Sequence, residues 1–275
     1  MFLSKKGLLK ILVAAIACLI IGSFCFVMYI LFAEMEIDAK TLLVLGIISY
    51  LLCVLSIFWG RYAEGKAILI NLGNTLVRKE LKPAEFIKHY EALKNSTDLV
   101  IKKPSIEVLR LVTTAYYVLN DRENVLETVD EMLSVADEKK KAYVNLMKTS
   151  FLFSYGRKEE AESLFIETQQ VKLDFMCKSL TDNILKTDRA MAMGDYKIAE
   201  AENLRLLEQT FPKLDNLGKL IVHYQLGEVY EKLNDNEKAV LHYQYCVNHG
   251  RETAIKQSAK AAIEKYSIQN VDKKG

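Results

Sequence analysis

Three residues with metal-ligating side chains lie close together near the C-terminal end of the chain. His242, Cys246 and His249 are spaced at i, i+4 and i+7, which places them on one face of a helix. Imidazole and thiolate are ligands that Zn²⁺ prefers in proteins. Cys246, however, stands where a helical repeat needs a small core residue, and the sequence offers no evident fourth ligand. We therefore expect a packed helix here, and predict neither a metal nor a cofactor.

Other catalytic signals are sparse. His89 and His223 stand next to Tyr90 and Tyr224 in helical patterns, where packed or surface histidines are expected. The sequence contains no nucleophile elbow, zinc-peptidase motif, phosphate-binding loop or dinucleotide fingerprint. Its five cysteines form no CxxC pair, and its net charge of +2 gives no signature of nucleic-acid binding. These features predict a protein that is not an enzyme.

Two apolar stretches predict a membrane anchor over residues 1–60. Residues 8–32 carry a single charge, Lys10, and residues 42–60 carry none. At about 1.5 Å per residue, each stretch is long enough to cross about 30 Å of hydrocarbon as a transmembrane helix. The sequence thus predicts two N-terminal transmembrane helices that contact membrane lipid.

Basic residues predict the orientation of this anchor. Lys5 and Lys6 precede the first stretch, Arg61 and Lys66 follow the second, and the connector 33–41 is net acidic. The positive-inside rule then places both termini in the cytoplasm, and we expect the plasma membrane of a bacterium. Small residues recur along both stretches at helix-packing intervals, which indicates either that the two helices pack on each other or that they form a homodimer.

The rest of the chain reads as helices. Residues 61–104 predict a helical connector, with a possible extra hairpin. Its first helix runs to about Glu80, with a bend or close packing at Gly65 and Gly73, and its second begins at Pro83.

Four helix pairs are expected to follow over residues 105–267. Small side chains after each turn lie 36, 38 and 40 residues apart, at Val125, Ala161, Ala199 and Ala239. Such self-similarity predicts an α-solenoid, in which each pair buries its apolar face against the next. A capping helix is expected from about Glu252 to Tyr266, with a frayed tail over residues 268–275.

The fourth pair resembles the tetratricopeptide repeat (TPR) family, and the likeness extends over about residues 105–250. Its pattern places Leu226-Gly227 and Tyr230 on the first helix, and Ala239 and Tyr243 on the second. The first three pairs depart from the family pattern, because threonine replaces the first-helix glycine at Thr113, Thr149 and Thr187. We expect longer helices and a less regular superhelix as a result.

The resemblance implies a concave groove, lined by the first helix of each pair, that holds a protein or peptide partner. Carrying the groove positions onto this chain predicts partner contacts at Arg110, Tyr117, Tyr143, Leu146, Phe153, Ile184, Met191, Tyr224 and Glu228, with Thr114, Ser150, Asp188 and Glu231 completing the lining. The lining is largely apolar with acids at one end, so an apolar ligand, helical or with a basic tail, is expected. Alternatively, several of these side chains pack on a neighbouring helix, including the capping helix.

The sequence thus predicts an all-α protein that acts as a membrane-anchored scaffold for protein–protein interaction. The alternative is a regulatory or sensor subunit whose two spans dock on a polytopic membrane enzyme or transporter.

Overall fold

The structure, a computed structural model, describes residues 39–95, 104–170, 177, 184–209 and 213–272. Over these residues the chain forms twelve helices and no strand, which confirms the all-α prediction. The predicted first span, residues 8–32, lies outside the described residues.

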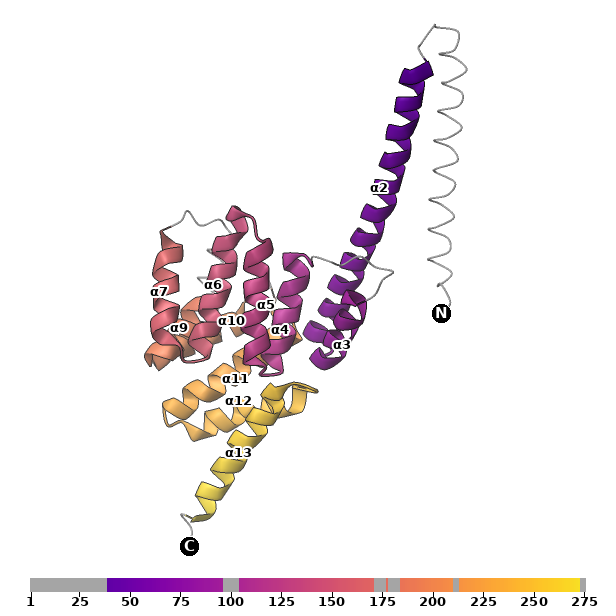
Figure 1. Ribbon diagram of the computed structural model, residues 1–275. Helices are drawn as coiled ribbons and strands as arrows, with labels where there is room; N and C mark the ends of the chain where they lie inside the picture. Colours follow the sequence, from indigo (N-terminus) through magenta and orange to yellow (C-terminus); the bar gives the residue numbers. More distant parts are fainter. Residues whose placement is uncertain (1–38, 96–103, 171–176, 178–183, 210–212, 273–275) are drawn as a thin grey trace. The chain divides into compact units, whose positions relative to one another are not determined.

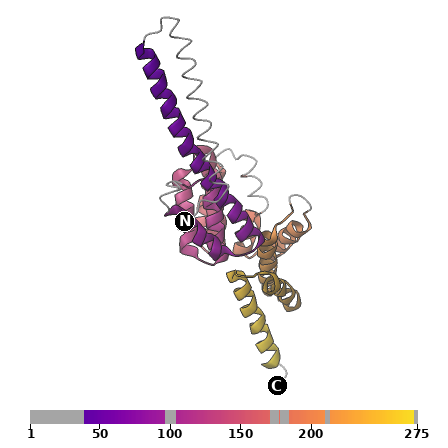
Figure 2. The same ribbon diagram turned by 90° about the vertical axis from the view of Figure 1, so that its right-hand side faces the viewer.

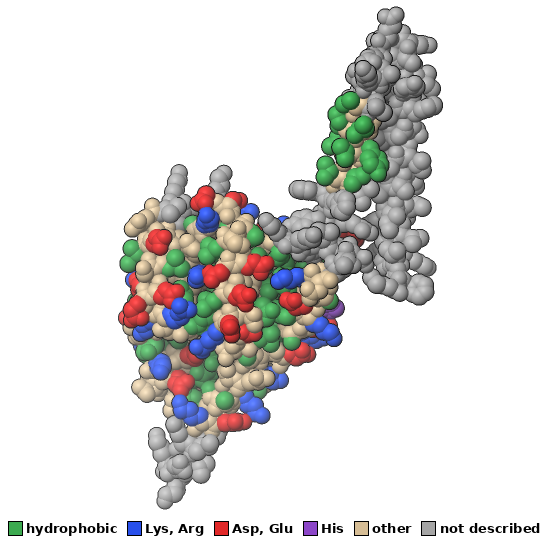
Figure 3. Space-filling view, viewed as in Figure 1, with side chains coloured by type: hydrophobic (Ala, Val, Ile, Leu, Met, Phe, Trp, Pro, Cys, Tyr) green, Lys and Arg blue, Asp and Glu red, His purple; other side chains and the backbone are tan. Residues whose placement is uncertain are grey.

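The chain divides into two compact units. The first comprises residues 1–65 and 97–100, and the second comprises residues 66–96 and 101–275. Helix α2 (Ala39–Leu72) begins in the first unit and ends in the second. In the first unit, α2 exposes large apolar side chains, drawn green in Figure 3: Val44, Ile47, Ile48, Tyr50, Leu51, Leu52 and Leu55. Within the described part of the chain, no helix combines the length and the apolar character needed to cross a membrane.

The second unit consists of helices that pack as neighbouring pairs (Figure 1). The pairs are η1 (Gly73–Lys79) with α3 (Pro83–Lys94), α4 (Ile106–Val118) with α5 (Arg122–Val135), α6 (Glu138–Ser154) with α7 (Lys158–Gln169), α9 (Lys186–Met193) with α10 (Tyr196–Glu208), and α11 (Asn216–Lys232) with α12 (Asn236–His249). Helix α13 (Ala254–Asp272) packs on α12 and continues to Asp272, beyond the end expected at Tyr266 (Figure 2).

Four pairs, from α4/α5 to α11/α12, close with the same turn. A residue with positive φ occupies the equivalent position in each, at Asn120, Gly156, Gly194 and Asn234. The following amide donates to a carbonyl five residues earlier, a Schellman-type bond: Asp121 to Tyr116, Arg157 to Leu152, Asp195 to Ala190 and Asp235 to Tyr230, at 2.9–3.0 Å. The predicted turn positions are therefore confirmed. The four turns also share the same backbone hydrogen bond.

Small side chains allow the two helices of a pair to approach closely. The four predicted positions, Val125, Ala161, Ala199 and Ala239, are all fully buried. In the fourth pair the ring of Tyr243 lies on Gly227, where an added Cβ would be 2.5 Å from Tyr243 Cε1. A glycine is thus needed at this position because an aromatic ring from the second helix of the pair covers it.

The end of α2 and η1 bury residues at every fourth position. Leu69, Gly73, Val77 and Leu81 are all buried. Every fourth residue of an α-helix drifts about 40° around the axis, because a turn takes about 3.6 residues. A π-helix, with its i→i+5 bonds, has more residues per turn, so four residues fall short of a full turn and the drift reverses. The change from α to π at Gly73 therefore keeps the four buried residues on one side of the helix. The sequence predicted a helix that continues to about Glu80, without this change of hydrogen bonding.

Close packing at Gly73, one of the two outcomes expected from the sequence, is confirmed. A Cβ built there would lie 2.7 Å from Leu111 Cδ1 on α4. The glycine thus allows η1 to lie directly against α4.

We predict that Gly227→Ala destabilises the protein by about 1–3 kcal/mol, because the new methyl group must displace the buried Tyr243 ring. Denaturant unfolding of the full chain in detergent, followed by circular dichroism, measures this loss. Adding Tyr243→Leu should recover part of it, and a double-mutant cycle with zero coupling would contradict the contact.

Candidate functional site

A buried carboxylate joins three helix pairs. Asp188 on α9 is only 5% exposed. Its Oδ1 accepts a hydrogen bond from Gln225 Nε2 of α11 at 2.9 Å, and its Oδ2 accepts a short one from Ser150 Oγ of α6. All three residues come from first helices, which are the helices that the resemblance places along the groove. The second, third and fourth pairs are therefore tied together at one side chain.

Burial disfavours the charged forms of the Asp188 and Glu228 carboxyl groups. Desolvation raises the pKa of Asp188 to about 6, although both hydrogen bonds favour the carboxylate and oppose the shift. Desolvation also raises the pKa of Glu228, one turn after Gln225, to about 7, and the charges of Glu231 and Asp188 act in the same direction. Because neither donor to Asp188 is cationic, the centre is acidic and can be partly protonated near neutral pH.

Aromatic side chains border the acidic centre. The Tyr117 ring on α4 lies 5.3 Å from that of Phe151 on α6, and Phe151 stacks on Tyr155 at 6.4 Å. Burial raises the pKa of Tyr117, and the charge of Asp188 is the next largest cause, so this phenol lies near the buried carboxylate. On α11, the Tyr224 ring is 5.7 Å from Tyr243.

The structure separates the predicted groove residues into two groups. Leu146 and Phe153 are buried in a hydrophobic cluster with Ala161, Cys177 and Leu185, so they offer no surface to a partner. The expectation that they contact a partner fixed the helix that carries them but not the side of that helix on which they lie. The other seven positions are accessible: Ile184 is exposed, and Arg110, Tyr117, Tyr143, Met191, Tyr224 and Glu228 are half-buried.

The acidic end of the predicted lining is in contact with the chain's own C-terminal helix. Lys265 Nζ of α13 lies 3.1 Å from Glu231 Oε1, and Tyr243 Oη donates to Glu231 Oε2 at 3.1 Å. Ser258 of α13 forms a hydrogen bond that lowers the pKa of Tyr224, although burial raises it more strongly. This part of the lining thus follows the alternative in which the capping helix covers it.

Histidines form a pair that the sequence pattern did not reveal. His223 Nδ1 and His242 Nδ1 lie 2.9 Å apart, between α11 and α12. His223 stacks on Tyr245 with ring centroids 3.7 Å apart, and burial followed by the neighbouring imidazole lowers its pKa to about 4. The pair is therefore neutral at pH 7. Its only available signal was the i and i+19 spacing across a turn.

The suggested group His242, Cys246 and His249 does not converge on one point. Cys246 is fully buried, and its Sγ donates to Leu220 O at 3.5 Å, while His242 faces His223. His249 packs on the ring of Tyr245 at 4.4 Å. Among the described residues, no three His, Cys, Asp or Glu side chains are grouped to hold a metal ion.

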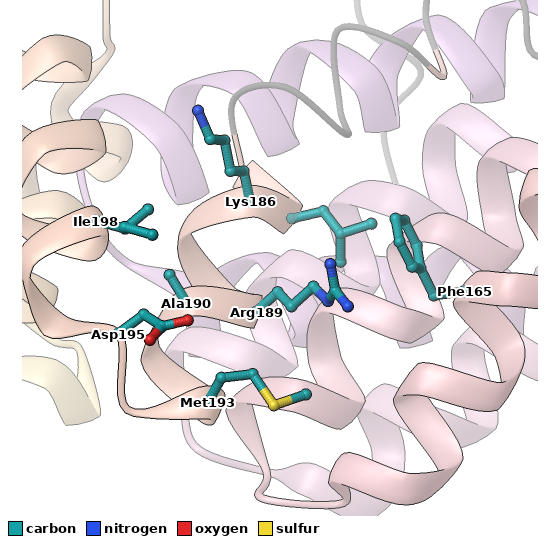
Figure 4. Close-up of a pocket in the computed structure, with 8 residues that line it drawn as sticks. Phe165, Lys186, Arg189, Ala190, Met193, Asp195 and Ile198 are labelled. Carbon is teal, nitrogen blue, oxygen red and sulfur yellow. The ribbon is translucent and has the colours of Figure 1, made fainter.

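A small pocket opens between α7, α9 and α10 (Figure 4). Its volume is about 370 Å³, and it is lined by Phe165, Leu185, Lys186, Arg189, Ala190, Met193, Asp195 and Ile198. Arg189 pairs with Glu162 at 2.5 Å, and Lys186 pairs with Glu202 at 2.5 Å. Because both cations already have anionic partners, the pocket is a mainly apolar recess.

Comparisons with known proteins give no match: no protein-family model, curated protein or solved structure is similar to this chain. The functional argument therefore rests on the residues themselves.

We predict that Asp188 and Glu228 each lower the stability of the second unit as pH rises from about 4 to about 7, whereas His223, whose folded pKa is lowered, raises it over the same range. The folded pKa values of Asp188 and Glu228 are raised, so the unfolded chain releases these protons first and gains stability relative to the folded one. Asp188→Asn removes the titrating carboxyl and should therefore make stability fall less, or rise more, with pH than in the wild-type chain. Denaturant midpoints measured from pH 4 to 8 test this, and a variant with the wild-type slope would contradict it.

Proposed function

We propose that this protein is a membrane-anchored scaffold that binds a partner protein through a TPR-like array of helical pairs. The observation that carries the proposal is the repeated turn of four successive pairs, with its shared backbone hydrogen bond. Stacked pairs of this kind present side chains from several first helices on one face, a geometry suited to holding a peptide segment.

Side chains on that face define the partner's chemistry. Ile184 is 49% exposed, and Met191 and Tyr143 are half-buried, so apolar contacts can anchor a segment there. Acidic and basic side chains alternate over the face of the second unit in Figure 3, without a large basic patch. This mixture supports a protein partner rather than nucleic acid.

The anchor is proposed to consist of two transmembrane helices, residues 8–32 and 42–60, with both termini in the cytoplasm. No described helix by itself meets the requirements for a span, so the proposal for the second helix rests on the uncharged sequence of residues 42–60, with the exposed apolar side chains of α2 as support. Support for the first comes from sequence alone. Anchoring would raise the local concentration of the array near membrane-bound partners.

A regulatory or sensor subunit is the second candidate. One observation favours it: α2 continues without a break from the apolar stretch into the second unit, where η1 follows directly. A movement of the proposed span could therefore reach the helical array along one continuous helix.

Charge placed on the exposed part of α2 should weaken membrane integration. Leu51→Arg puts a cation near the middle of residues 42–60, at a cost of about 2.5–3.5 kcal/mol on insertion scales. The matched control is Ile68→Arg, also an exposed apolar residue of α2 but beyond that stretch. A cysteine introduced at Gly275 should become accessible to labelling from outside in Leu51→Arg and not in Ile68→Arg, because loss of the second span alone leaves the C-terminus outside; equal protection in both variants would argue against the second span.

Site-specific photo-crosslinking in membranes tests the partner and separates the two candidates. A crosslinker at Ile184 should capture a protein that one at Ile166, 58% exposed on the second helix α7, does not. A polytopic protein captured from Leu51 would favour the regulatory subunit. Identical products from Ile184 and Ile166 would contradict a specific binding face.

A further inference from the structure

The segment of residues 66–82, here called the strap, contacts both ends of the helical array. It comprises the end of α2, η1 and the residues up to Lys82. Helix η1 packs against α4, the first helix of the first pair, and also against α11, the first helix of the fourth pair. The strap therefore packs on two of the first helices that are expected to line the groove.

Three polar contacts between described residues join the strap to the fourth pair and to the turn that follows it. Arg78 Nε is 3.2 Å from Asp215 Oδ2, and both side chains are at least one-third exposed. Asn216 Nδ2 donates to Lys79 O at 2.8 Å, and the Glu252 amide donates to Leu81 O at 3.3 Å. Surface contacts of this kind contribute little to stability. The apolar stripe from Leu69 to Leu81 therefore supplies most of the attraction.

The strap also has a second helical state available to it. The π-helical bonds of η1 serve to keep the four-residue stripe buried, and π-helices of this length are rare. Once released from α4 and α11, residues 73–79 no longer need that register, so they can continue α2 as an ordinary α-helix. The loss of buried contacts is then offset in part by better helical hydrogen bonds.

We propose that the strap is a latch that bridges the first helices α4 and α11, and that it opens as a unit by changing from π-helical to α-helical hydrogen bonding. An amphipathic helix of a partner, with apolar residues spaced like those of the strap, would occupy the surface that opening exposes. The partner's role rests on the proposed function, whereas the opening itself does not.

Hydrogen–deuterium exchange of the full chain in detergent micelles tests the opening. Amides of residues 74–82 should exchange at least about 100-fold faster than those of residues 220–232 in α11, through an opening that leaves α11 folded. Equal rates for the two segments would mean that the strap separates only on global unfolding, and the latch would be excluded.

Gly73→Ala should accelerate exchange in the strap about tenfold, because its methyl group meets Leu111 in the closed state and favours the α-helix in the open state. Gly60→Ala is the matched control: it adds the same methyl group to α2, where no neighbouring atom of the described residues lies within 4 Å, and should leave strap exchange unchanged. Acceleration by both variants, or by neither, would overturn the latch.

Arg78→Ala supplies a milder variant should Gly73→Ala fail to fold. It removes the ion pair with Asp215, the N-cap residue of α11, and should speed strap exchange about threefold. Lys66→Ala removes an ion pair of similar exposure, 3.0 Å from Glu107 on the α4 side, and should have a smaller effect. The reverse order would contradict an opening away from α11.

To separate the latch from the proposed function, a labelled peptide of residues 66–82 can be added to each variant. Binding to Gly73→Ala and not to the wild-type chain shows that the exposed surface accepts a helix of this chemistry. Fast strap exchange without peptide binding would retain the opening but exclude this surface as the partner site.

Discussion

The apolar contact between the strap and the two ends of the array is the constraint on which the second unit depends. Leu69, Val77 and Leu81 share one hydrophobic cluster with residues of α11, α12 and α13. Hydrophobic association has no direction of its own, so the register of this contact must come from elsewhere. It comes from Gly73 against Leu111, and from the π-helical turn that keeps the stripe on one side.

Local features of this fold could be read from the sequence, whereas its long-range contacts could not. The turns at Gly156 and Gly194 and the small residues Ala161 and Ala199 carry their structural reason in their own chemistry, a positive φ or a close helix approach. The contact between Lys79 and Asn216 spans 137 residues and leaves no periodic trace. Nor does composition reveal that a helix will adopt π geometry, because tertiary packing imposes it.

In the candidate site, too, the sequence predicted local features but not long-range contacts. Projecting a family pattern placed first-helix residues correctly on the first helices, but it could not fix their rotation about each helix axis. Leu146 and Phe153 therefore lie in the core, while Asp188, expected only as part of the lining, is the hub of a hydrogen-bond network. Its importance follows from Ser150 and Gln225, which reach it from other pairs. The sequence around Asp188 does not predict hydrogen bonds to Ser150 and Gln225, which lie 38 and 37 residues away.

Joining the first pair to the fourth has a consequence for how the array can evolve. Open stacks of helical repeats lengthen or shorten freely, because each repeat needs only its immediate neighbours. Here an inserted or deleted pair would change the distance between α4 and α11, and η1 could no longer reach both. The number of pairs is thus limited by the requirement that η1 contact both α4 and α11. A duplication of one pair would be tolerated only if another segment replaced one of these contacts.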